Sequence, residues 1–479
     1  MLWFGAAQAH TGVNHARHHH PWHRGLPNAS VAPLQRAQAD AAALHGIPAS
    51  ELAPNAPQHY IIKRGDTLWR IAGQYLKKPG CWPALWGMNR AQIRNPHWIF
   101  PGQVLVLTIE NGRSTLRVMK SKPQYAYVTN ERADTVSAYS IDVSSGAMTP
   151  VPGSPFVAGN MPNTVAVNPA GTFAYVANGG ASVKDGPGTV SAYRVDAATG
   201  ALSPIPGSPF AAGKYPSSVA IHPAGTFVYV TNVYDSTVSA YRINAATGAL
   251  TPIPGSPFAG PPVARNAPEP SCITVNPAGT FAYVANFGSN SISAYRINPA
   301  TGALTTIPGS PFATGDGPAT VAIHPAGTFA YVADLGDRAV LTYRINAITG
   351  TLTPVTGRPV YIDHGPSSVT VNPTGTSAYV TSETNHNVDV FSINPSTGAL
   401  DDLSKLHYAT EFDPSFVAVN PTDTFVYVTN AGFPNVGGSW NSGSVSVYRI
   451  NAAYGTLDEI PGSPFAAGAD PTSITVTQP

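Results

Sequence analysis

The side chains best suited to acid–base chemistry lie in loops of the second part of the chain. Glu269, His364 and Asp413 could activate a water molecule and stabilise developing charge, as the opening of a lactone requires. Several carboxylates close together, Asp363 among them, could also hold a divalent metal through oxygen ligands. Solvated loop charges account for the same residues without any chemistry. The sequence has no fixed-spacing metal motif, Gly-x-Ser-x-Gly turn or phosphate-binding loop, so we predict no bound cofactor.

A second pattern with metal-binding residues stands near the N-terminus. The stretch from His18 to His23 contains four histidines, and His10 and His15 lie nearby. Neutral imidazoles in such a tract can bind Zn²⁺ or Ni²⁺, but we favour a flexible tract without a metal role. The two cysteines, Cys81 and Cys272, are far apart in the sequence, and we expect two separate thiols rather than a disulfide.

The composition favours many short strands over long helices. Glycine (45) and proline (47) together make up almost a fifth of the 479 residues, and both interrupt helix interiors. Only 11% of the residues are charged, where a soluble domain typically has about 25%. A helical bundle and a coiled coil are therefore excluded. The length allows one large repeat domain together with a smaller domain.

Charge divides the chain into a basic front and an acidic remainder. Residues 1–122 carry 14 Lys and Arg against 4 Asp and Glu, and residues 123–479 carry 12 against 21. Net charges of +10 and −9 indicate two parts with different partners. No run of 18 apolar residues exists, so we expect no membrane span. Ala7-Gln8-Ala9 matches the end of a signal peptide, although an unstructured tail explains this segment equally well.

Residues 58–108 are expected to fold as a small β-α-α-β unit. An apolar strand over 59–63 is followed by Asp66, a natural cap for the helix that begins after it. Apolar residues with helical spacing follow, at Leu68, Ile71, Ala72, Tyr75 and Leu76. Pro79-Gly80 ends this helix, a second short helix covers 84–89, and a closing strand covers 103–107.

The motifs of this segment resemble those of a known family. They are Gly65-Asp66-Thr67-Leu68-Trp69, Asn95-Pro96, Ile99 and Pro101-Gly102-Gln103. Because both ends match with the correct spacing, residues 58–108 resemble a LysM domain. The resemblance implies binding of glycans that contain N-acetylglucosamine, such as peptidoglycan. It also implies a binding groove formed by Gly65, Asp66, Thr67, Leu68, Asn95, Pro96 and Ile99.

The groove residues also have a purely structural interpretation. Asp66 could be only a helix cap, and Leu68 and Ile99 only core residues, although the resemblance makes sugar binding the favoured interpretation. In a sugar-binding groove, Leu68 and Ile99 would supply an apolar wall for the acetyl methyl group. The segment carries seven Lys and Arg against one Asp, a charge that favours anionic cell-wall polymers. It contains no nucleic-acid recognition element, so we expect no nucleic-acid partner.

From residue 123 onward the sequence repeats a short motif seven times. The first copy reads Ala126-Tyr127-Val128-Thr129-Asn130, and its tyrosine recurs at intervals of 48 or 54 residues. The seven tyrosines are Tyr127, Tyr175, Tyr229, Tyr283, Tyr331, Tyr379 and Tyr427. Seven copies at this period predict a seven-bladed β-propeller with four short strands in each blade. The predicted fold class is therefore mainly β, with a small β-α-α-β domain and a disordered leader in front.

The two ends of the repeat region predict how the ring closes. The first Tyr-Val strand, 126–130, has no apolar strand before it, and the last apolar strand, 473–476, has no Tyr-Val strand after it. The C-terminal strand should therefore complete the first blade, which removes an open edge. Residues 123–479 resemble the YVTN-repeat, lactonase-like seven-bladed propellers. The resemblance implies the fold but leaves the activity open, because the group includes lactonases of the 6-phosphogluconolactonase type and surface proteins.

Insertions in the repeats predict a binding face. The loops after Asn178 and Asn430 and the link from Phe258 to Pro270 are long, and all belong to one face of a propeller. Tolerated drift in exposed loops explains them equally well. The polar residues expected near the channel mouth on this face are Glu131, Lys214, Tyr215, Arg265, Glu269, Asp334, Asp337, Arg338, Asp363, His364, Glu411, Asp413 and Asp470.

We predict a cell-envelope protein that is periplasmic, displayed on the cell surface or secreted. Its expected parts are a leader over 1–57, a LysM domain over 58–108, a linker over 109–122 and a propeller over 123–479. The LysM domain is expected to bind peptidoglycan, and the propeller to be a rigid platform for a protein or a small ligand. The alternative is a lactone hydrolase with its site at the channel mouth, and we favour binding over catalysis.

Overall fold

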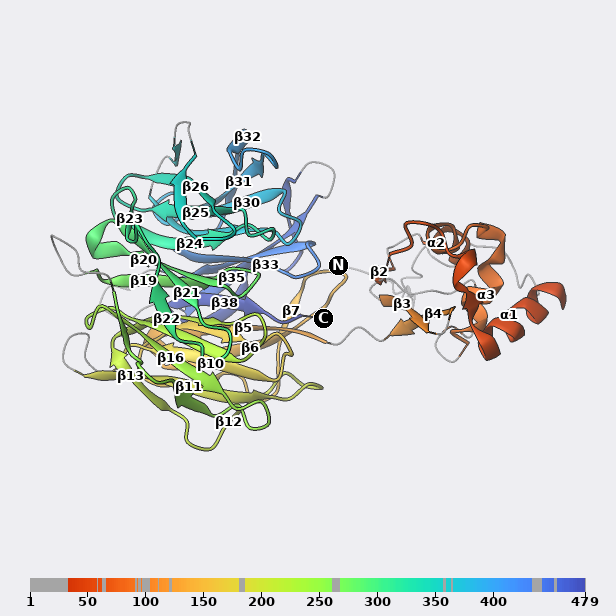
Figure 1. Cartoon of the computed structure of the whole chain (residues 1–479), viewed down its shortest axis with the longest axis horizontal. Coiled ribbons are helices and arrows are strands. Elements are labelled where there is room, and N and C mark those ends of the chain that lie inside the picture. The colour runs from red at the N-terminus through yellow and green to blue at the C-terminus, as the bar shows by residue number, and fades with distance from the viewer. Residues whose placement is uncertain are drawn as a thin grey trace, which may run out of the picture. The chain divides into compact units, whose positions relative to one another are not determined.

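The computed structural model of the 479-residue chain consists of two compact units, residues 1–120 and residues 121–479 (Figure 1). Each unit has hydrophobic cores of its own. The structure describes residues 33–57, 59–62, 66–90, 93, 96, 104–110, 112–119, 123–180, 186–260, 268–355, 359–362, 365–432, 442–451 and 455–478. No helix within these ranges is long and apolar enough to cross a membrane.

The first unit combines three helices with a four-stranded antiparallel sheet. The helices are α1 (Pro33–His45), α2 (Leu68–Tyr75) and α3 (Trp82–Gly87), with 3-10 turns η2 (Ala49–Glu51) and η3 (Pro79–Cys81). The strands lie in the order β1 (Ile47–Pro48), β4 (Arg113–Met119), β3 (Val104–Glu110) and β2 (His59–Ile61). The predicted β-α-α-β order is therefore present as β2, α2, α3 and β3.

The start of α2 differs from the prediction in one residue. Thr67, and not Asp66, caps this helix, because its side-chain oxygen accepts a hydrogen bond of 3.2 Å from the backbone N–H of Arg70. Asp66 instead accepts a hydrogen bond of 2.8 Å from the phenol of Tyr60 in β2. The carboxylate thus ties the loop to the sheet, and the neighbouring threonine provides the capping oxygen.

Two segments expected to lack structure belong to this unit. α1 lies inside the predicted leader, and β4 lies inside the predicted linker at 109–122. α1 begins with a proline, whose missing N–H costs nothing at that position, and it buries Ala39 and Ala42. α1 and α3 lie side by side (Figure 1), so close that a Cβ on Gly87 would be 2.0 Å from the carbonyl oxygen of Ala39. Small residues make this contact, so the sequence has no periodic pattern of large apolar side chains that would predict α1.

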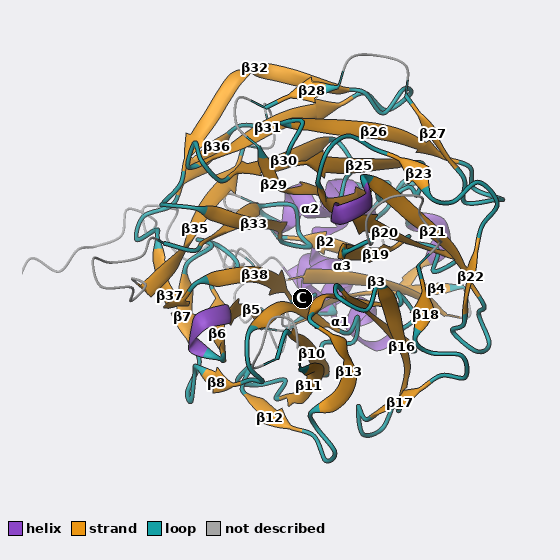
Figure 2. Ribbon diagram, turned by 90° about the vertical axis from the view of Figure 1, so that its left-hand side faces the viewer, coloured by secondary structure: helices purple, strands orange, loops and turns teal. Residues whose placement is uncertain are grey.

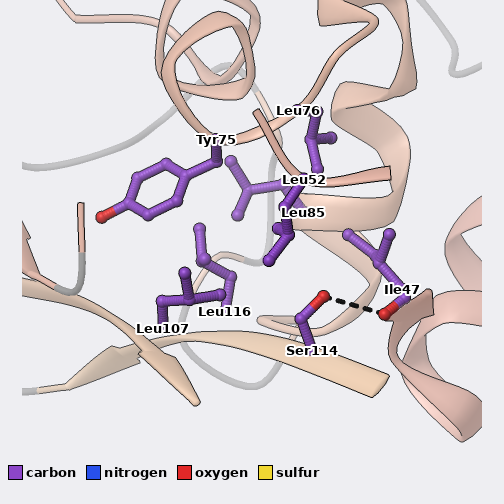
Figure 3. Close-up of a pocket in the computed structure, with 8 residues that line it drawn as sticks. All are labelled: Ile47, Leu52, Tyr75, Leu76, Leu85, Leu107, Ser114 and Leu116. Atoms are coloured by element: carbon purple, nitrogen blue, oxygen red, sulfur yellow. Dashed lines mark hydrogen bonds between the residues drawn. The ribbon is translucent and has the colours of Figure 1, made fainter. Parts of the chain in front are cut away.

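The core of the first unit lies between its helices and its sheet (Figure 3). The residues around its centre are Ile47, Leu52, Tyr75, Leu76, Leu85, Leu107, Ser114 and Leu116. The space left among them is about 10 Å³, roughly what one water molecule needs, so these side chains form packed core rather than a ligand site. The hydroxyl of Ser114 donates a hydrogen bond of 2.8 Å to the carbonyl of Ile47, which satisfies it in the interior.

The second unit is built from seven antiparallel sheets, which are numbered as blades and given from the inner strand outward. Blade 1 contains β38 (Pro471–Val476), β5 (Gln124–Asn130), β6 (Thr135–Ile141), β7 (Met148–Pro150) and β8 (Phe156–Val157). Blade 2 contains β9 (Pro162–Val167), β10 (Phe173–Asn178), β11 (Pro187–Val195), β12 (Leu202–Pro204) and β13 (Phe210–Lys214). Blade 3 contains β14 (Pro216–Ile221), β15 (Phe227–Asn232), β16 (Thr237–Ile243), β17 (Leu250–Pro252) and β18 (Phe258–Ala259).

The remaining four blades follow the same plan. Blade 4 contains β19 (Pro270–Val275), β20 (Phe281–Asn286), β21 (Ser291–Ile297), β22 (Leu304–Thr306) and β23 (Phe312–Ala313). Blade 5 contains β24 (Pro318–Ile323), β25 (Phe329–Asp334), β26 (Ala339–Ile345), β27 (Leu352–Pro354) and β28 (Val360–Tyr361). Blade 6 contains β29 (Pro366–Val371), β30 (Ser377–Ser382), β31 (Asn387–Ile393) and β32 (Leu400–Ala409). Blade 7 contains β33 (Pro414–Val419), β34 (Phe425–Asn430), β35 (Ser442–Ile450), β36 (Leu457–Glu459) and β37 (Phe465–Ala469). Short 3-10 turns follow β5 and β20, at η4 (Glu131–Ala133) and η5 (Phe287–Ser289).

The arrangement of the blades confirms the predicted ring. β38 pairs with β5, so the C-terminal strand completes blade 1 as the sequence predicted. In Figure 2 the outer strands β12, β17, β22, β27 and β32 lie at the rim, and the inner strands β29, β33 and β38 lie nearer the middle. In six blades the outer position is filled by two short strands, which pair with the third strand on either side of a turn. Only blade 6 fills it with one continuous strand, β32.

Each blade is joined to the next by contacts that recur around the ring. All seven motif tyrosines are fully buried, and five of them donate hydrogen bonds of 2.9–3.0 Å to a glycine carbonyl of the next blade. In blade 3, for example, Tyr229 donates to Gly302, whose Cα faces the ring of Phe227. The guanidinium of Arg242 lies 4.9 Å from the centre of that ring on the same blade. The glycines that accept these hydrogen bonds lie in the short turns between the third strand and the outer strand of each blade. We call the side of the propeller that carries these turns the turn face, and the opposite side the loop face.

Candidate functional site

The structure describes part of the predicted LysM groove. Asp66, Thr67 and Leu68 form the entry to α2. Pro96 is described and buried, whereas Gly65, Asn95 and Ile99 lie outside the described residues. A groove between the two loops therefore stays a prediction.

The described residues of this region divide into a buried and an exposed set. Leu68 is 2% exposed and belongs to the hydrophobic core, which favours the structural interpretation of this residue over a wall for a ligand. The side chain of Asp66 is also 2% exposed. The pKa of the Tyr60 phenol is raised, first by burial and then by the hydrogen bond to Asp66 and the charge of Asp66. Thr67 and Trp69 lie at the surface, and Trp69 is 57% exposed. An exposed indole at the helix entry is a feature that our sequence analysis did not assign to the site.

On the propeller, seven equivalent residues surround the channel at the loop face. Each directly precedes the proline that begins an inner strand, and we call them the mouth positions: Met161, Tyr215, Glu269, Gly317, Gly365, Asp413 and Asp470. Five of them are not glycine yet have left-handed backbones, with φ between 47° and 59°. Such a backbone costs about 1 kcal/mol or more for each non-glycine residue. The chain therefore holds a tyrosine and three carboxylates at strained positions around one opening.

Hydrogen bonds from neighbouring segments fix the backbone of the mouth positions. The carbonyls of Asp470 and Asp413 accept hydrogen bonds of 2.9 Å from the N–H groups of Glu131 and Ala431. The N–H of Asp413 donates in turn to Nδ1 of His386, at 3.1 Å. The backbone of Asp413 is thus held by Ala431 of its own blade and by His386 of blade 6, so its side chain is presented with a defined direction.

Directly inside the mouth, a ring of side-chain hydrogen bonds joins the inner strands. The hydroxyls of Ser217, Ser271, Ser367 and Ser415 donate to the proline carbonyl of the next blade, over 2.6–3.0 Å. Ala319 stands at the equivalent position of blade 5. Below the ring, a channel of about 530 Å³ is lined by hydroxyl, amide, thiol and apolar side chains of all seven inner strands. No charged side chain lines this channel among the described residues, so charge is concentrated at the mouth.

Carboxyl groups gather where blades 6, 7 and 1 meet. The side chains of Asp413 of blade 7 and Glu383 of blade 6 lie near each other. Burial, and then the charge of Glu383, raises the pKa of Asp413. Burial and the nearby Asp470 raise the pKa of Glu131 to about 7. Carboxyls in this range both accept and release protons at neutral pH, which is the property of a general base or acid.

The other members of the cluster orient or balance these carboxyls. Asp470 forms an ion pair of 2.9 Å with Nε of Arg132, and burial raises the pKa of Asp470. Tyr215 reaches over blade 2, where a Cβ on Gly179 would lie 2.9 Å from its ring. Its phenol is hydrogen-bonded to Glu131, and burial with the Glu131 charge raises the pKa of Tyr215 to about 12. The phenol thus stays protonated and remains a hydrogen-bond donor at the mouth.

The predicted catalytic candidates have different outcomes. Asp413 lies in the carboxyl cluster, and Glu269 occupies the mouth position of blade 4, three blades away. His364 lies outside the described residues, as do Asp363 and Arg265. No three His, Cys, Asp or Glu side chains within the described ranges lie close enough together to hold a metal ion.

Our sequence analysis missed two members of the cluster. Glu383 follows the Tyr-Val strand of blade 6 at the same offset at which Glu131 follows that of blade 1. An alignment of the repeats would have found it. The second is His386, whose ring lies 4.1 Å from that of Phe412, which is half exposed. Its role depends on a contact between two blades, which no single repeat reveals.

One expected mouth residue is buried instead. Asp334 is 0% exposed and takes the place of an asparagine that ends the Tyr-Val strand of five other blades. In blade 3 this asparagine, Asn232, donates hydrogen bonds of 3.0 and 2.8 Å to Thr237 and Ser239. Blade 5 has Ala339 and Leu341 at those positions. Burial raises the pKa of Asp334 to about 8, against the opposing effect of the Gly315 backbone N–H. The carboxyl is therefore protonated at neutral pH.

The comparisons with known families address both units. A family model described as lactonase, 7-bladed beta-propeller, matches residues 111–265, 181–356 and 314–478, which together are more than half of the chain. The chain belongs to this lactonase family of seven-bladed β-propellers. A LysM domain model matches residues 60–108. Among curated proteins, the uncharacterized protein YqbP of Bacillus subtilis (strain 168) is 42% identical over 60 residues, which cover 11% of this chain and 27% of YqbP. The match thus spans about a quarter of that protein.

Solved structures show the same lactonase-type propeller fold. A 6-phosphogluconolactonase candidate from Bacteroides uniformis matches with a TM-score of 0.64 and 17% identity, over 74% of this chain and 100% of that chain. The periplasmic gluconolactonase PpgL of Pseudomonas aeruginosa matches with a TM-score of 0.62 and 17% identity, over 74% and 100%. A protein from Lactobacillus plantarum matches with a TM-score of 0.59 and 20% identity, over 74% and 99%. At these identities the likeness concerns the fold alone.

Proposed function

We propose that the first unit binds the N-acetylglucosamine-containing glycan of the cell envelope and that the propeller is a rigid platform attached to it. The observation that carries this proposal is the LysM match over 60–108. LysM domains are typical of envelope and extracellular proteins, so we propose a periplasmic, cell-surface or secreted location. The ligand of the platform, a small molecule or a protein, would meet the loop face.

The entry to α2 supplies groups that suit a sugar ligand. The first turn of a helix has backbone N–H groups without partners inside the helix, and Thr67 satisfies that of Arg70. The exposed indole of Trp69 lies next to Gly80, where a Cβ would be 3.8 Å from its ring. A flat apolar ring beside free hydrogen-bond donors matches a sugar, which has an apolar C–H face and polar edges.

Calorimetric titration of the full chain with N-acetylglucosamine oligomers tests this proposal. We expect binding by the wild type and about tenfold weaker binding by Trp69→Ala, a loss of about 1.4 kcal/mol. Tyr234→Ala, which removes an exposed aromatic residue of the propeller, is the matched control and should bind as the wild type does. A wild-type chain that shows no binding up to millimolar oligomer would refute the proposal.

A second candidate function is the hydrolysis of a lactone at the propeller mouth. The observation that favours it is the carboxyl cluster around Asp413, in a chain of the lactonase family. In this scheme an ionised carboxyl of the Asp413 and Glu383 pair takes a proton from water, and the water oxygen forms a bond to the lactone carbonyl carbon. The ring C–O bond then breaks, and the carboxyl returns its proton to the ring oxygen, which gives the hydroxy acid.

Turnover of a panel of lactones by the full chain, with and without divalent metal, tests the second candidate. If the pair is the general base, Asp413→Asn and Glu383→Gln should each lower kcat by about 10²- to 10⁴-fold, and the rate should rise with pH as Asp413, whose pKa is raised, ionises. Glu269→Gln and His364→Ala test the remaining candidates in the same assay. Asp458→Asn, on the outer strand of blade 7, is a control that should leave the rate unchanged. A wild-type chain without turnover on any lactone would leave the platform as the function of the propeller.

A further inference from the structure

The first unit contains a groove lined mostly by residues outside the LysM match. Its volume is about 560 Å³, within the range of about 300–1,000 Å³ that is usual for ligand sites. The C-terminal turn of α1, residues 42–46, forms one wall together with Met88, and the faces of β3 and β4 that carry Thr108, Arg113, Thr115 and Arg117 form the other. Because α1 and β4 both lie outside residues 60–108, the groove is an addition of this chain to the LysM domain. None of Asp66, Thr67 and Leu68 lines it.

The alternation of β4 places its basic side chains in the groove. Ser114 and Leu116 are buried on the core side of the strand, so Arg113, Thr115 and Arg117 point the other way, into the groove. Both arginines are exposed, and no ion pair joins either to a carboxylate of the described side chains.

The two guanidinium groups differ in their cross-strand neighbours. The register sets Arg113 opposite Glu110 at the end of the hairpin, and Arg117 opposite Val106. Arg117 therefore has an apolar cross-strand neighbour, and its guanidinium is available for an external anion. Four residues along a strand separate the two arginines by about 13 Å. A ligand that meets both must be extended.

The opposite wall is mostly apolar. Ala42 is buried, Ala43, the exposed Leu44 and Met88 complete the surface, and His45 lies at the end of α1. Gly46 sets this wall against the sheet, because its φ is +65° and a Cβ there would lie 2.6 Å from the carbonyl oxygen of Ser114. The groove thus combines a basic, hydroxyl-bearing side with a wall that accommodates methyl groups.

We infer that this groove binds the short acidic peptide stem of peptidoglycan, whose carboxylates and methyl side chains complement its two walls. The inference rests on the proposed function, because the stem is attached to the glycan that the LysM region would hold. Guanidinium groups bind carboxylates in a bidentate manner, and an exposed pair of this kind contributes only about 0.2–1 kcal/mol. The contribution becomes measurable because the bound glycan holds the stem at a high effective concentration.

Binding of the full chain to two ligands tests the inference. One ligand is a peptidoglycan fragment with its stem peptides, and the other is an N-acetylglucosamine oligomer without peptide. For the double variant Arg113→Gln/Arg117→Gln we expect about fivefold to tenfold weaker binding of the fragment and unchanged binding of the oligomer. The single variant Arg117→Gln should account for most of the loss. Arg36→Gln, which removes an exposed arginine of α1 outside the groove, should change neither affinity.

The outcomes separate this inference from the proposed function. Unchanged binding of the fragment by the double variant would overturn the inference, as would an equal loss for both ligands, because a peptide-specific groove predicts a difference. If the wild type fails to bind the oligomer but binds the fragment in an Arg117-dependent manner, the proposed glycan site is wrong and the stem groove stands. Circular dichroism of each variant checks that a loss of binding does not reflect a loss of fold.

Discussion

The seven blades resemble one another more closely on the turn face of the propeller than on the loop face. On the turn face, the same contacts occur in blade after blade, as with Phe227 of blade 3 between its own Arg242 and Gly302 of blade 4. On the loop face, equivalent positions hold unlike side chains, from Met161 and Gly317 to Tyr215 and Asp413. The backbone is left-handed at six of the seven mouth positions, whichever side chain they carry. The repeat thus preserves the geometry of both faces and the chemistry of only one.

This difference indicates where stability and where function reside. Contacts that recur in most blades join neighbouring blades, so the turn face should tolerate little change. Strained backbones that carry a phenol and carboxylates are costly, and their presence around one opening suits a binding or catalytic role. The predictions below test that division, beginning with the largest expected effect.

A Cβ added at a recurring contact of the turn face should be strongly destabilising. In Gly302→Ala the new Cβ would lie 2.5 Å from the ring of Phe227, on a backbone with φ +78°. We expect the free energy of unfolding to fall by about 2–5 kcal/mol, from overpacking and backbone strain together. Gly171→Ala is the matched control, because it has a similar φ of +69° but nothing within 4 Å, and it should cost about 1–2 kcal/mol. Urea midpoints measure both, and equal losses would mean that the contact with Phe227 does not matter.

Restoring the repeat at blade 5 should stabilise the propeller in a pH-dependent way. The pKa of Asp334 is about 8 in the fold, against about 4 in an unfolded chain. A carboxyl with a raised pKa keeps its full contribution to stability below pH 4 and loses it as the pH rises towards 8. Asp334→Asn removes this loss, because an amide does not ionise. The amide would meet Ala339 and Leu341 instead of hydroxyls, which has a cost of its own. We therefore expect the free energy of unfolding to rise by about 1–3 kcal/mol at pH 8. Melting temperatures between pH 4 and pH 9 give the result, and a gap that does not widen with pH would contradict it.

The smallest effect concerns the mouth itself. Tyr215→Phe removes the hydrogen bond that lowers the pKa of Glu131, so this pKa should rise further above about 7. Because Tyr215 is only partly buried and the substitution removes a single hydroxyl, stability should change by less than about 1 kcal/mol. Titration of the Glu131 carboxyl carbon by NMR measures the shift. An unchanged or lower pKa would show that the phenol does not contact this carboxylate.

The repeated features could be predicted from the sequence, and the singular ones could not. The period of the tyrosines gave the number of blades, and the unpaired strands at both ends gave the closure through β38. The carboxyl cluster joins Glu131, Glu383, Asp413 and Asp470 from three blades, and only the curvature of the ring brings them together. Asp334 was expected at the mouth as one of the polar residues of the loop face, whereas in the structure its side chain is buried at the end of the Tyr-Val strand.

In the first unit the sequence was informative where large apolar residues follow a period. The spacing from Leu68 to Tyr75 predicted α2 correctly, and the four periodic residues Leu68, Ile71, Ala72 and Tyr75 are buried. α1 was not predicted, because alanines make its contact with Gly87 and alanine is common in disordered segments as well. β4 does alternate, with Leu116 and Val118 inside, but its short length and charged residues resemble a linker. Packing against an existing sheet, rather than local propensity, orders both segments.

Sedimentation of the full chain with purified peptidoglycan tests the central claim most directly. If the first unit recognises sugar, the chain should pellet with the polymer at low salt and in about 1 M salt, where exposed charges are screened within about 3 Å. Soluble N-acetylglucosamine oligomers should release it under both conditions. Binding that vanishes at high salt and resists the oligomers would contradict the claim, because it would show that only the positive charge of the first unit holds the polymer.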